Sequence, residues 1–260
     1  MISLSRVRAS FLASMAVLAA VLNTADLSRA AEPEVAAVPV RAWKAIGPFG
    51  DRQLKDRPRE QHPQDGAHNF VNRVFASAKY PVEKQIDLDA VYTGDLTVDV
   101  NGKEHELRWT NLTATADVVE FKPLPAGKGA PGANDSVVGL VYFSTWVFAP
   151  AEMTVAAQFP AYQGIPRYGA TEHVWINGQL VKQRQEHPDN KLILHPVEKQ
   201  SIALKNGWNH VLVKVWSTWA GAKAGLVLQV PAAKAFDFKF SAEPPKEVGR
   251  KFTIDGAKAE

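Results

Sequence analysis

The sequence predicts an all-β protein in which two antiparallel sheets pack as a β-sandwich. Short runs of β-branched and aromatic residues recur between residues 40 and 240, and clusters of Gly, Pro and Asn separate them. Segments with the 3.6-residue period of an amphipathic helix are scarce. Many short strands joined by turns are typical of an antiparallel sandwich or barrel. The chain of 260 residues contains no cysteine, so packing rather than disulfide bonds must hold this fold together.

The first 30 residues have the layout of a secretory signal peptide. Arg6 and Arg8 precede the apolar run Phe11–Leu22, and the small residues Ser28 and Ala30 stand at the −3 and −1 positions of a cleavage site. The run is shorter than the ~20 apolar residues of a membrane span, which disfavours the alternative of an uncleaved anchor. We therefore expect export to the periplasm or the extracellular space, with no membrane span after cleavage.

The charge balance argues against a nucleic-acid partner. The whole chain has 30 Lys and Arg against 27 Asp and Glu, but without residues 1–30 the counts become 27 and 26. The remaining charges are scattered rather than gathered in a basic stripe. The absence of cysteine also excludes a thiol nucleophile, a thiolate metal site and covalently attached haem.

The folded part is expected at residues 40–241. Residues 31–39 are predicted as an extended linker, because Pro33 and Pro39 oppose helix formation. The first strand is expected at Val40–Ile46. Further strands are expected in the first half at Gln85–Leu88, Leu96–Val100 and Glu106–Thr110.

The second half begins with the most hydrophobic stretch of the predicted mature chain. Val137–Phe148 is rich in β-branched and aromatic residues and is predicted as a buried strand. The Pro- and Gly-rich residues 123–133 before it are predicted as a loop. Later strands are expected at Met153–Phe159, Ser201–Leu204, His210–Trp216 and Leu226–Val230, with an edge strand at Ala235–Phe240. Residues 242–260 are expected to form a mobile C-terminal tail.

Two Asn-Gly pairs mark predicted hairpins. Asn101-Gly102 follows one expected strand, and Asn177-Gly178 joins Thr171–Ile176 to Gln179–Lys182. An Asn-Gly pair suits a type I′ turn, because both central residues of that turn need positive φ angles. Trp175, in the strand before the second pair, is expected to help fill the space between the sheets.

The stretches WINGQLV (residues 175–181) and IALKNGWNHVLVKVW (residues 202–216) combine an aromatic-aliphatic-Asn-Gly turn with a later Leu-Lys-x-Gly-x-Asn turn. In this they resemble the galactose-binding-like jelly-roll domains that accompany glycoside hydrolases and other polysaccharide-processing enzymes. WKAIGPFG, DLDAVYTGD and VVGLVYFSTWVFAP resemble the N-terminal half of such modules. The resemblance spans residues 40–230 and implies a two-sheet jelly roll that binds carbohydrate.

Aromatic residues in two loops are the candidate ligand contacts. They are Tyr162, Gln163, Arg167, Tyr168 and Trp219. If the strands that contain Trp175 and Val213 are antiparallel neighbours, both loops lie at one end of the sandwich. Flat aromatic rings there would cover the apolar faces of sugars, while the polar neighbours bind hydroxyls. The alternative is that these large side chains only cap the end of the core.

Catalytic and metal-binding patterns have less support. Asp87 and Asp89 would share one face of a strand, as the two carboxyls of a glycosidase require, but acids beside a turn are usually solvated. The related modules often have an acidic pair before the Trp175 strand, whereas Arg167–Thr171 contains none. We expect no cofactor. The remaining alternative is a structural calcium ion held by loop oxygens, at Asn134 and Asp135 or at Asp189 and Asn190.

The function expected from the sequence is a secreted, non-catalytic binding module for carbohydrate or another extracellular polymer. One alternative is a structural or protein-interaction module of the cell envelope. A second alternative is a polysaccharide hydrolase or lyase. A fold by itself does not distinguish these three classes.

Overall fold

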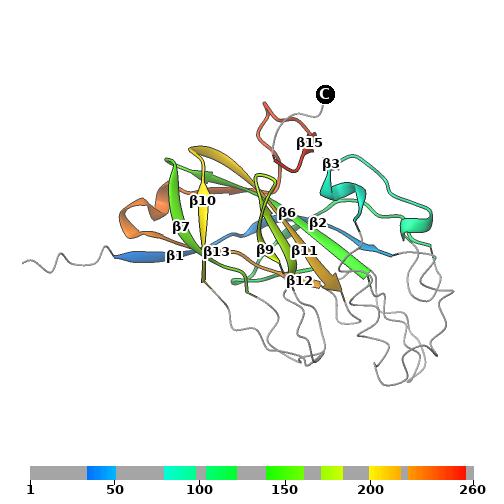
Figure 1. Ribbon diagram of the computed structural model, residues 1–260, viewed down its shortest axis with the longest axis horizontal. Coiled ribbons are helices and arrows are strands. Elements are labelled where there is room, and N and C mark those ends of the chain that lie inside the picture. The colour runs from blue at the N-terminus through cyan, green and yellow to red at the C-terminus, as the bar shows by residue number, and fades with distance from the viewer. Residues whose placement is uncertain are drawn as a thin grey trace, which may run out of the picture. The chain divides into compact units, whose positions relative to one another are not determined.

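The computed structural model describes residues 34–50, 79–97, 104–121, 139–160, 171–183, 199–217 and 222–255 (Figure 1). These residues form an all-β protein in which antiparallel sheets pack as a β-sandwich, as the sequence predicts. Within the described part of the chain, no helix has the length and apolar character needed to span a membrane.

The larger sheet contains seven strands in the order β4-β2-β6-β11-β8-β9, with β14 pairing with β6 off this path. Its strands are β2 (Ala42–Phe49), β4 (Thr110–Thr113), β6 (Gly139–Ala149), β8 (Thr171–Ile176), β9 (Gln179–Gln183), β11 (Gly207–Ser217) and β14 (Lys239–Ser241). The two longest, β6 and β11, are paired in the centre. The hydrophobic stretch Val137–Phe148 is therefore the central strand that its composition indicates.

The smaller sheet contains four strands in the order β1-β13-β7-β10. Its strands are β1 (Val35–Pro39), β7 (Met153–Gln158), β10 (Lys199–Leu204) and β13 (Val227–Pro231). Residues 35–39 were expected in a linker, but they pair along their length with β13. Proline is compatible with this arrangement because β1 is an edge strand, where one backbone side needs no partner.

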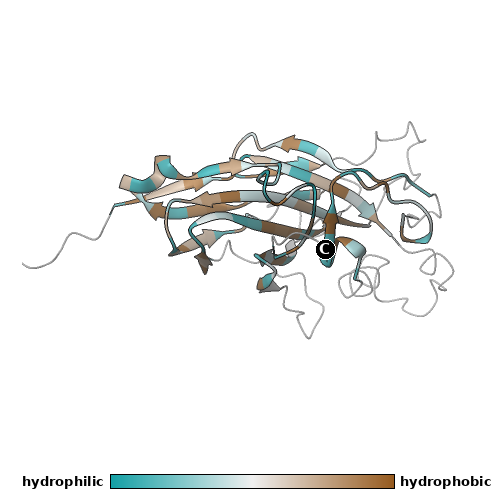
Figure 2. Cartoon of the chain, turned by 90° about the horizontal axis from the view of Figure 1, so that it is seen from above, coloured by the Kyte–Doolittle hydropathy of each residue, from teal (hydrophilic) through white to brown (hydrophobic). Residues whose placement is uncertain are grey.

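The main core lies between these two sheets. Val211, Val213 and Val215 point to it from β11, and all three are fully buried. Ile202 and Leu228 meet them from the smaller sheet. Hydrophobic and hydrophilic residues alternate along the strands in Figure 2, as expected when one face of a strand packs on a core.

A small third layer covers part of the other face of the larger sheet. It consists of η2 (Pro81–Glu83), β3 (Gln85–Asp87) and β15 (Lys251–Thr253), which pairs with β3. Its apolar side chains form a second core with those of the larger sheet. Phe252 is fully buried there, with its ring centroid 5.3 Å from that of Trp146. The expected mobile tail is therefore corrected for residues 251–254, which are packed and paired.

The expected strand Glu106–Thr110 makes only an isolated bridge between Leu107 and Tyr92 before β4 begins at Thr110, and two more expected strands also have a different structure. Residues 96 and 97 of the expected strand Leu96–Val100 belong to the 3₁₀ turn η3 (Asp95–Thr97), in which the Thr97 amide and hydroxyl both donate to the Gly94 carbonyl. The first part of the expected strand Ala235–Phe240 belongs to the 3₁₀ segment η4 (Ala232–Asp237), and strand pairing begins only at β14, which pairs with β6. A short two-stranded sheet, β5 (Val119–Phe121) with β12 (Ala222–Ala224), completes the fold.

The predicted hairpin of β8 and β9 is present, and its turn is linked to β11. Asn177 has φ 49° and Gly178 has φ 78°, as a type I′ turn requires. The Asn177 side chain donates to Asn209 Oδ1 (2.8 Å) and accepts from the His210 amide (3.0 Å). Asn209 also donates to the carbonyls of Lys205 and Gly207. The two sequence motifs thus meet in one hydrogen-bond network that fixes the fold.

Candidate functional site

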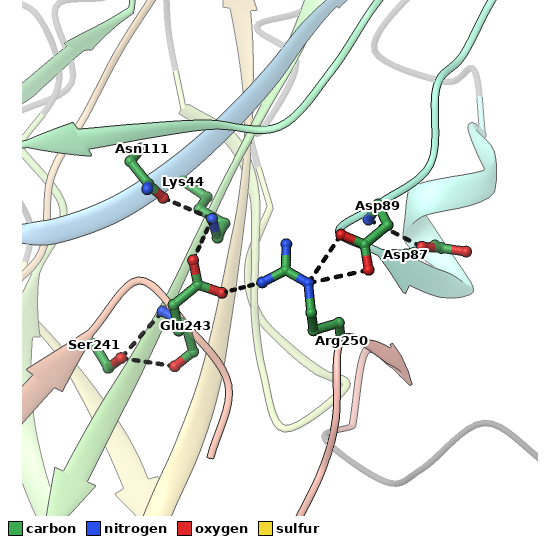
Figure 3. Close-up of polar contacts among 7 residues, drawn as sticks. All are labelled: Lys44, Asp87, Asp89, Asn111, Ser241, Glu243 and Arg250. Atoms are coloured by element: carbon green, nitrogen blue, oxygen red, sulfur yellow. Dashed lines mark hydrogen bonds and ion pairs between the residues drawn. The ribbon is translucent and has the colours of Figure 1, made fainter. Parts of the chain in front are cut away.

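Asp87 and Asp89, the carboxylates considered for catalysis, belong to a chain of ion pairs (Figure 3). Arg250 Nε donates one bifurcated hydrogen bond to the two carboxylate oxygens of Asp89, at 2.9 and 3.0 Å. Arg250 also binds Glu243 (2.8 Å), whose other oxygen lies 2.6 Å from the Nζ atom of buried Lys44. Asp87 lies 3.6 Å from Lys251 Nζ. Each carboxylate thus faces a cation, and the two of them fasten β15 and the segment before it to β3.

Ser144 and His210 form a second polar pair on the outer face of the larger sheet. The Ile254 carbonyl can only accept, so Nδ1 of His210 donates to it (2.9 Å). Nε2 is then the acceptor for the Ser144 hydroxyl (3.0 Å), which is the hydrogen bond that activates a serine nucleophile. Both side chains are buried, however, and burial lowers the pKa of His210 to about 4. Without access for a substrate, this pair serves to hold Ile254 on the sheet.

The two faces of the larger sheet differ in chemistry. The face toward the main core carries Val174, Val211 and Val213, whereas the opposite face buries charged and polar side chains. The buried polar residues of that outer face are Lys44, Ser144, His210 and Lys214. Because burying a charge requires a partner for it, the two lysines are paired: Lys44 with Glu243 and Lys214 with Glu83.

Lys214, Glu83 and Tyr142 form a hydrogen-bonded trio at the centre of this outer face. Lys214 on β11 is the cross-strand neighbour of Tyr142 on β6 and of His173 on β8. Its Nζ atom lies 2.8 Å from Glu83 Oε1, and Tyr142 donates its hydroxyl to the same oxygen. Burial raises the pKa of Tyr142 well above 10, and the negative charge of Glu83 raises it further. Tyr142 is therefore a fixed donor, and within the described part of the chain both hydrogen bonds to Glu83 are made to Oε1.

An aromatic platform lies beside the trio, on β8. The rings of His173 and Trp175 are nearly parallel, with an interplanar angle of 13° and centroids 5.4 Å apart. Both side chains are half-buried, and Leu180, the cross-strand neighbour of Trp175, is 48% exposed. Burial lowers the pKa of His173, and the charge of Lys214 lowers it further, so the ring is neutral at pH 7. Its Nδ1 atom is buried and has no hydrogen-bond partner among the described residues.

The position of Trp175 differs from the expectation. The side chain was expected between the two sheets, where its neighbours Val174 and Ile176 in fact lie. Because successive side chains of a strand point to opposite faces, Trp175 lies on the outer face with His173. We refer to Glu83, Tyr142, His173, Trp175 and Lys214 as the outer-face site.

The ligand contacts expected from the sequence lie outside the described residues. These are Tyr162, Gln163, Arg167, Tyr168 and Trp219. The residues considered for calcium, Asn134, Asp135, Asp189 and Asn190, lie outside them too. Over the ranges that the structure describes, no group of three or more His, Asp or Glu side chains is arranged to hold a metal ion.

The outer-face site was not predicted from the sequence, although the position of one of its residues, Lys214, could have been. The alternation in HVLVKVW already places Lys214 opposite the valines. Glu83 could not be found in this way, because it is 131 residues away along the chain from the lysine that it binds.

Comparison with known proteins gives no match. No family model matches the chain, and no curated protein or solved structure is significantly similar to it. Its function is therefore inferred from the chemistry of its own residues.

Proposed function

We propose that the protein is an exported, non-catalytic module that binds carbohydrate or a similar extracellular polymer through its outer-face site. The observation that carries this proposal is the nearly parallel, half-buried pair of His173 and Trp175. The galactose-binding-like jelly roll is part of the same proposal, supported by the antiparallel sandwich and by the Asn177–Asn209 network.

The outer-face site combines the two kinds of contact that a sugar needs. A sugar ring presents apolar C–H groups on its faces, which the aromatic surface of Trp175 can cover, and hydroxyls around its edge. Among the described residues, both hydrogen bonds to this carboxylate go to Oε1, so Glu83 Oε2 is the proposed acceptor for such a hydroxyl. Ligand sites generally pair apolar and aromatic walls with a few fixed polar groups in this way.

Titration of the wild-type protein against a panel of polysaccharides tests the proposal. We expect Trp175→Ala to weaken binding of the bound polysaccharide at least tenfold, which corresponds to about 1.4 kcal/mol of binding free energy. The matched control is Phe236→Ala on η4, which removes an aromatic side chain that is 97% exposed and lies outside the site. Its affinity should equal that of the wild type. The proposal is wrong if the wild type binds no member of the panel.

The loop residues of the sequence prediction remain proposed contacts. A Tyr168→Ala, Trp219→Ala double variant separates them from the platform. If the loops take part in binding, the double variant binds the polysaccharide less tightly than the wild type does, as Trp175→Ala is expected to do.

The second candidate function is a protein-interaction module of the envelope. It is favoured by Phe236, which is 97% exposed on η4, and by Val35, which is 55% exposed on β1 in contact with η4. Exposed apolar side chains on neighbouring elements are a feature of protein interfaces. Capture of one defined envelope protein that Phe236→Ala abolishes, in a chain without affinity for any polysaccharide, would favour this function.

A further inference from the structure

Residues 250–255 form a short segment on the outer face of the larger sheet, which we call the C-terminal flap. Its strand β15 pairs with β3 in a separate two-stranded sheet (Figure 1). The amide of Leu88, just after β3, donates to the Arg250 carbonyl (2.9 Å). Phe252 is fully buried, whereas both ends of the flap are exposed. Release of the flap would therefore break no strand pairing within the two large sheets.

The flap follows a turn that has hydrogen bonds of its own. The amides of Val248 and Gly249 both donate to the Pro245 carbonyl, at 3.0 and 3.3 Å. Gly249 ends this turn with φ 78°, a conformation that glycine adopts at little steric cost. The turn and the flap thus have separate contacts, and the flap can leave the sheet while the turn before it stays in place.

His210 lies beneath the flap, and its ring is fully buried. Nδ1 of the ring donates to the Ile254 carbonyl (2.9 Å), and the Phe252 ring lies 5.1 Å away between centroids. A second proton would place a charge in this buried site, and burial lowers the pKa of His210 to about 4. Water can reach the ring and stabilise its charged form only when the flap has moved away.

The groups that face the His210 ring do not replace water for a charged imidazole. Among the described residues, they are Ser144 and Trp146 from β6, Phe252 and the Ile254 carbonyl from the flap, and Asp255 after β15. The negative charge of Asp255 favours the protonated ring, but burial has the larger effect. The closed flap therefore opposes protonation.

Trp146 makes the closed flap less favourable by a second route. Its side chain is 2% exposed, and its ring packs against Phe252 with centroids 5.3 Å apart. The indole Nε1 is buried and has no hydrogen-bond partner among the described residues. A buried indole N–H usually finds a partner, and leaving it unpaired costs stability. Water would supply that partner when Phe252 moves away.

We propose that the C-terminal flap is an acid-released cover, which leaves the outer face when His210 takes up a proton and thereby uncovers Trp146. Trp146 and Trp175 both pack with the second core, on the face of the larger sheet that carries the proposed ligand site. The open form thus presents a further aromatic side chain, with its N–H donor, on that face. The movement belongs to the chain itself and does not depend on polysaccharide binding.

The direction of the pH effect follows from linkage. The His210 ring binds a proton near pH 4 under the closed flap, and near its ordinary value of 6.5 in the open form, where water surrounds it. Each decrease in pH between these values favours the open form. From pH 7 to pH 4.5, the equilibrium constant for opening should rise at least about tenfold. Because opening leaves both large sheets intact, it needs less free energy than unfolding the whole chain.

Hydrogen exchange of the full chain, followed by NMR at pH 7 and pH 4.5, tests the proposal. Protection factors are used, since they correct for the pH dependence of intrinsic exchange. The Leu88 amide and the Trp146 indole N–H report on the flap. The reference is the indole N–H of Trp43, which donates to the Val40 carbonyl (2.9 Å) in the main core. Both reporters should be at least about tenfold less protected than Trp43, and their protection should fall at least about tenfold in acid.

His210→Gln is the matched variant, because it removes the titrating ring and keeps the ion pairs of the flap. In this variant the protection of Leu88 should fall less than about threefold between the two pH values, as expected for exposed ion pairs alone. An equal fall in the variant and the wild type would overturn the proposal. If the variant does not fold, the wild type decides, and Leu88 protection that does not fall between pH 6.5 and the pH at which the His210 ring signal titrates overturns it.

Two further outcomes also contradict the proposal. Leu88 and Trp146 that are protected as strongly as Trp43 would show that the flap leaves only when the whole protein unfolds. Fast exchange at Leu88 with a Trp146 indole as protected as that of Trp43 would show that the flap opens without uncovering Trp146.

Discussion

His210 shows how a single side chain links two layers of this molecule. It is fully buried, donates to the Ile254 carbonyl and accepts from Ser144. The rings of Trp146 and Phe252 pack against it, with centroids 5.0 and 5.1 Å away. Burial lowers the pKa of His210 from 6.5 to about 4. The hydrogen bond to Ile254 and the negative charge of Asp255 act in the opposite direction and are weaker.

This pKa predicts a loss of stability in acid. The unfolded chain binds a proton at His210 near pH 6.5, whereas the folded protein does not until about pH 4. Stability should therefore fall as the pH decreases through this window, by about 3 kcal/mol in all, and level off below it. Urea unfolding at pH 7 and pH 4.5 measures the effect. His210→Gln is the control, and an equal pH dependence in both proteins would contradict the assignment.

At the scale of elements, the third layer is held by two kinds of contact of very different strength. The ion pairs of Arg250 with Asp89 and Glu243 are half-exposed, and such pairs contribute about 0–1 kcal/mol. Phe252 is fully buried, and removing a buried phenylalanine side chain costs about 3–5 kcal/mol. Apolar burial, and not the visible chain of charges, therefore stabilises this layer.

A pair of variants tests this ranking. Phe252→Ala should lower the free energy of unfolding by about 3–5 kcal/mol, and Arg250→Ala by less than about 1 kcal/mol. Both values follow from urea denaturation at neutral pH. An Arg250→Ala variant as unstable as Phe252→Ala would show that the ion pairs carry the layer instead.

Elements that are determined by neighbouring residues were predictable from the sequence. Elements that depend on pairing with a segment far away in the chain were not. The β8–β9 hairpin needs only Asn177-Gly178 and alternating side chains, and it was predicted within a residue. The partner of β15 is β3, more than 160 residues away, and two three-residue strands show no usable periodicity. Residues 96 and 97 were expected in a strand because the alternation of a short apolar segment does not exclude a 3₁₀ turn.

For the whole molecule, the two faces of the larger sheet differ in chemistry: one makes the core of the sandwich, and the other carries a second core and the proposed outer-face site. The inner face is almost entirely apolar and makes the core of the sandwich. The outer face carries paired charges and the His173–Trp175 platform. The sequence indicated the class of fold, whereas the aromatic loop residues that it suggested for a ligand lie outside the described residues. It did not indicate this face, because the site joins Glu83 to strands that are far away in the chain.

NMR spectroscopy of the indole N–H groups tests the central claim most directly, since the chain contains seven tryptophans. The signal of Trp175 is assigned by comparison with Trp175→Ala, and the polysaccharide bound in the panel is then added in steps. The outer-face site predicts that the Trp175 signal shifts with the same saturation curve as binding, while that of Trp43, fully buried in the main core, stays unchanged. Saturable binding that leaves the Trp175 signal unmoved would contradict it.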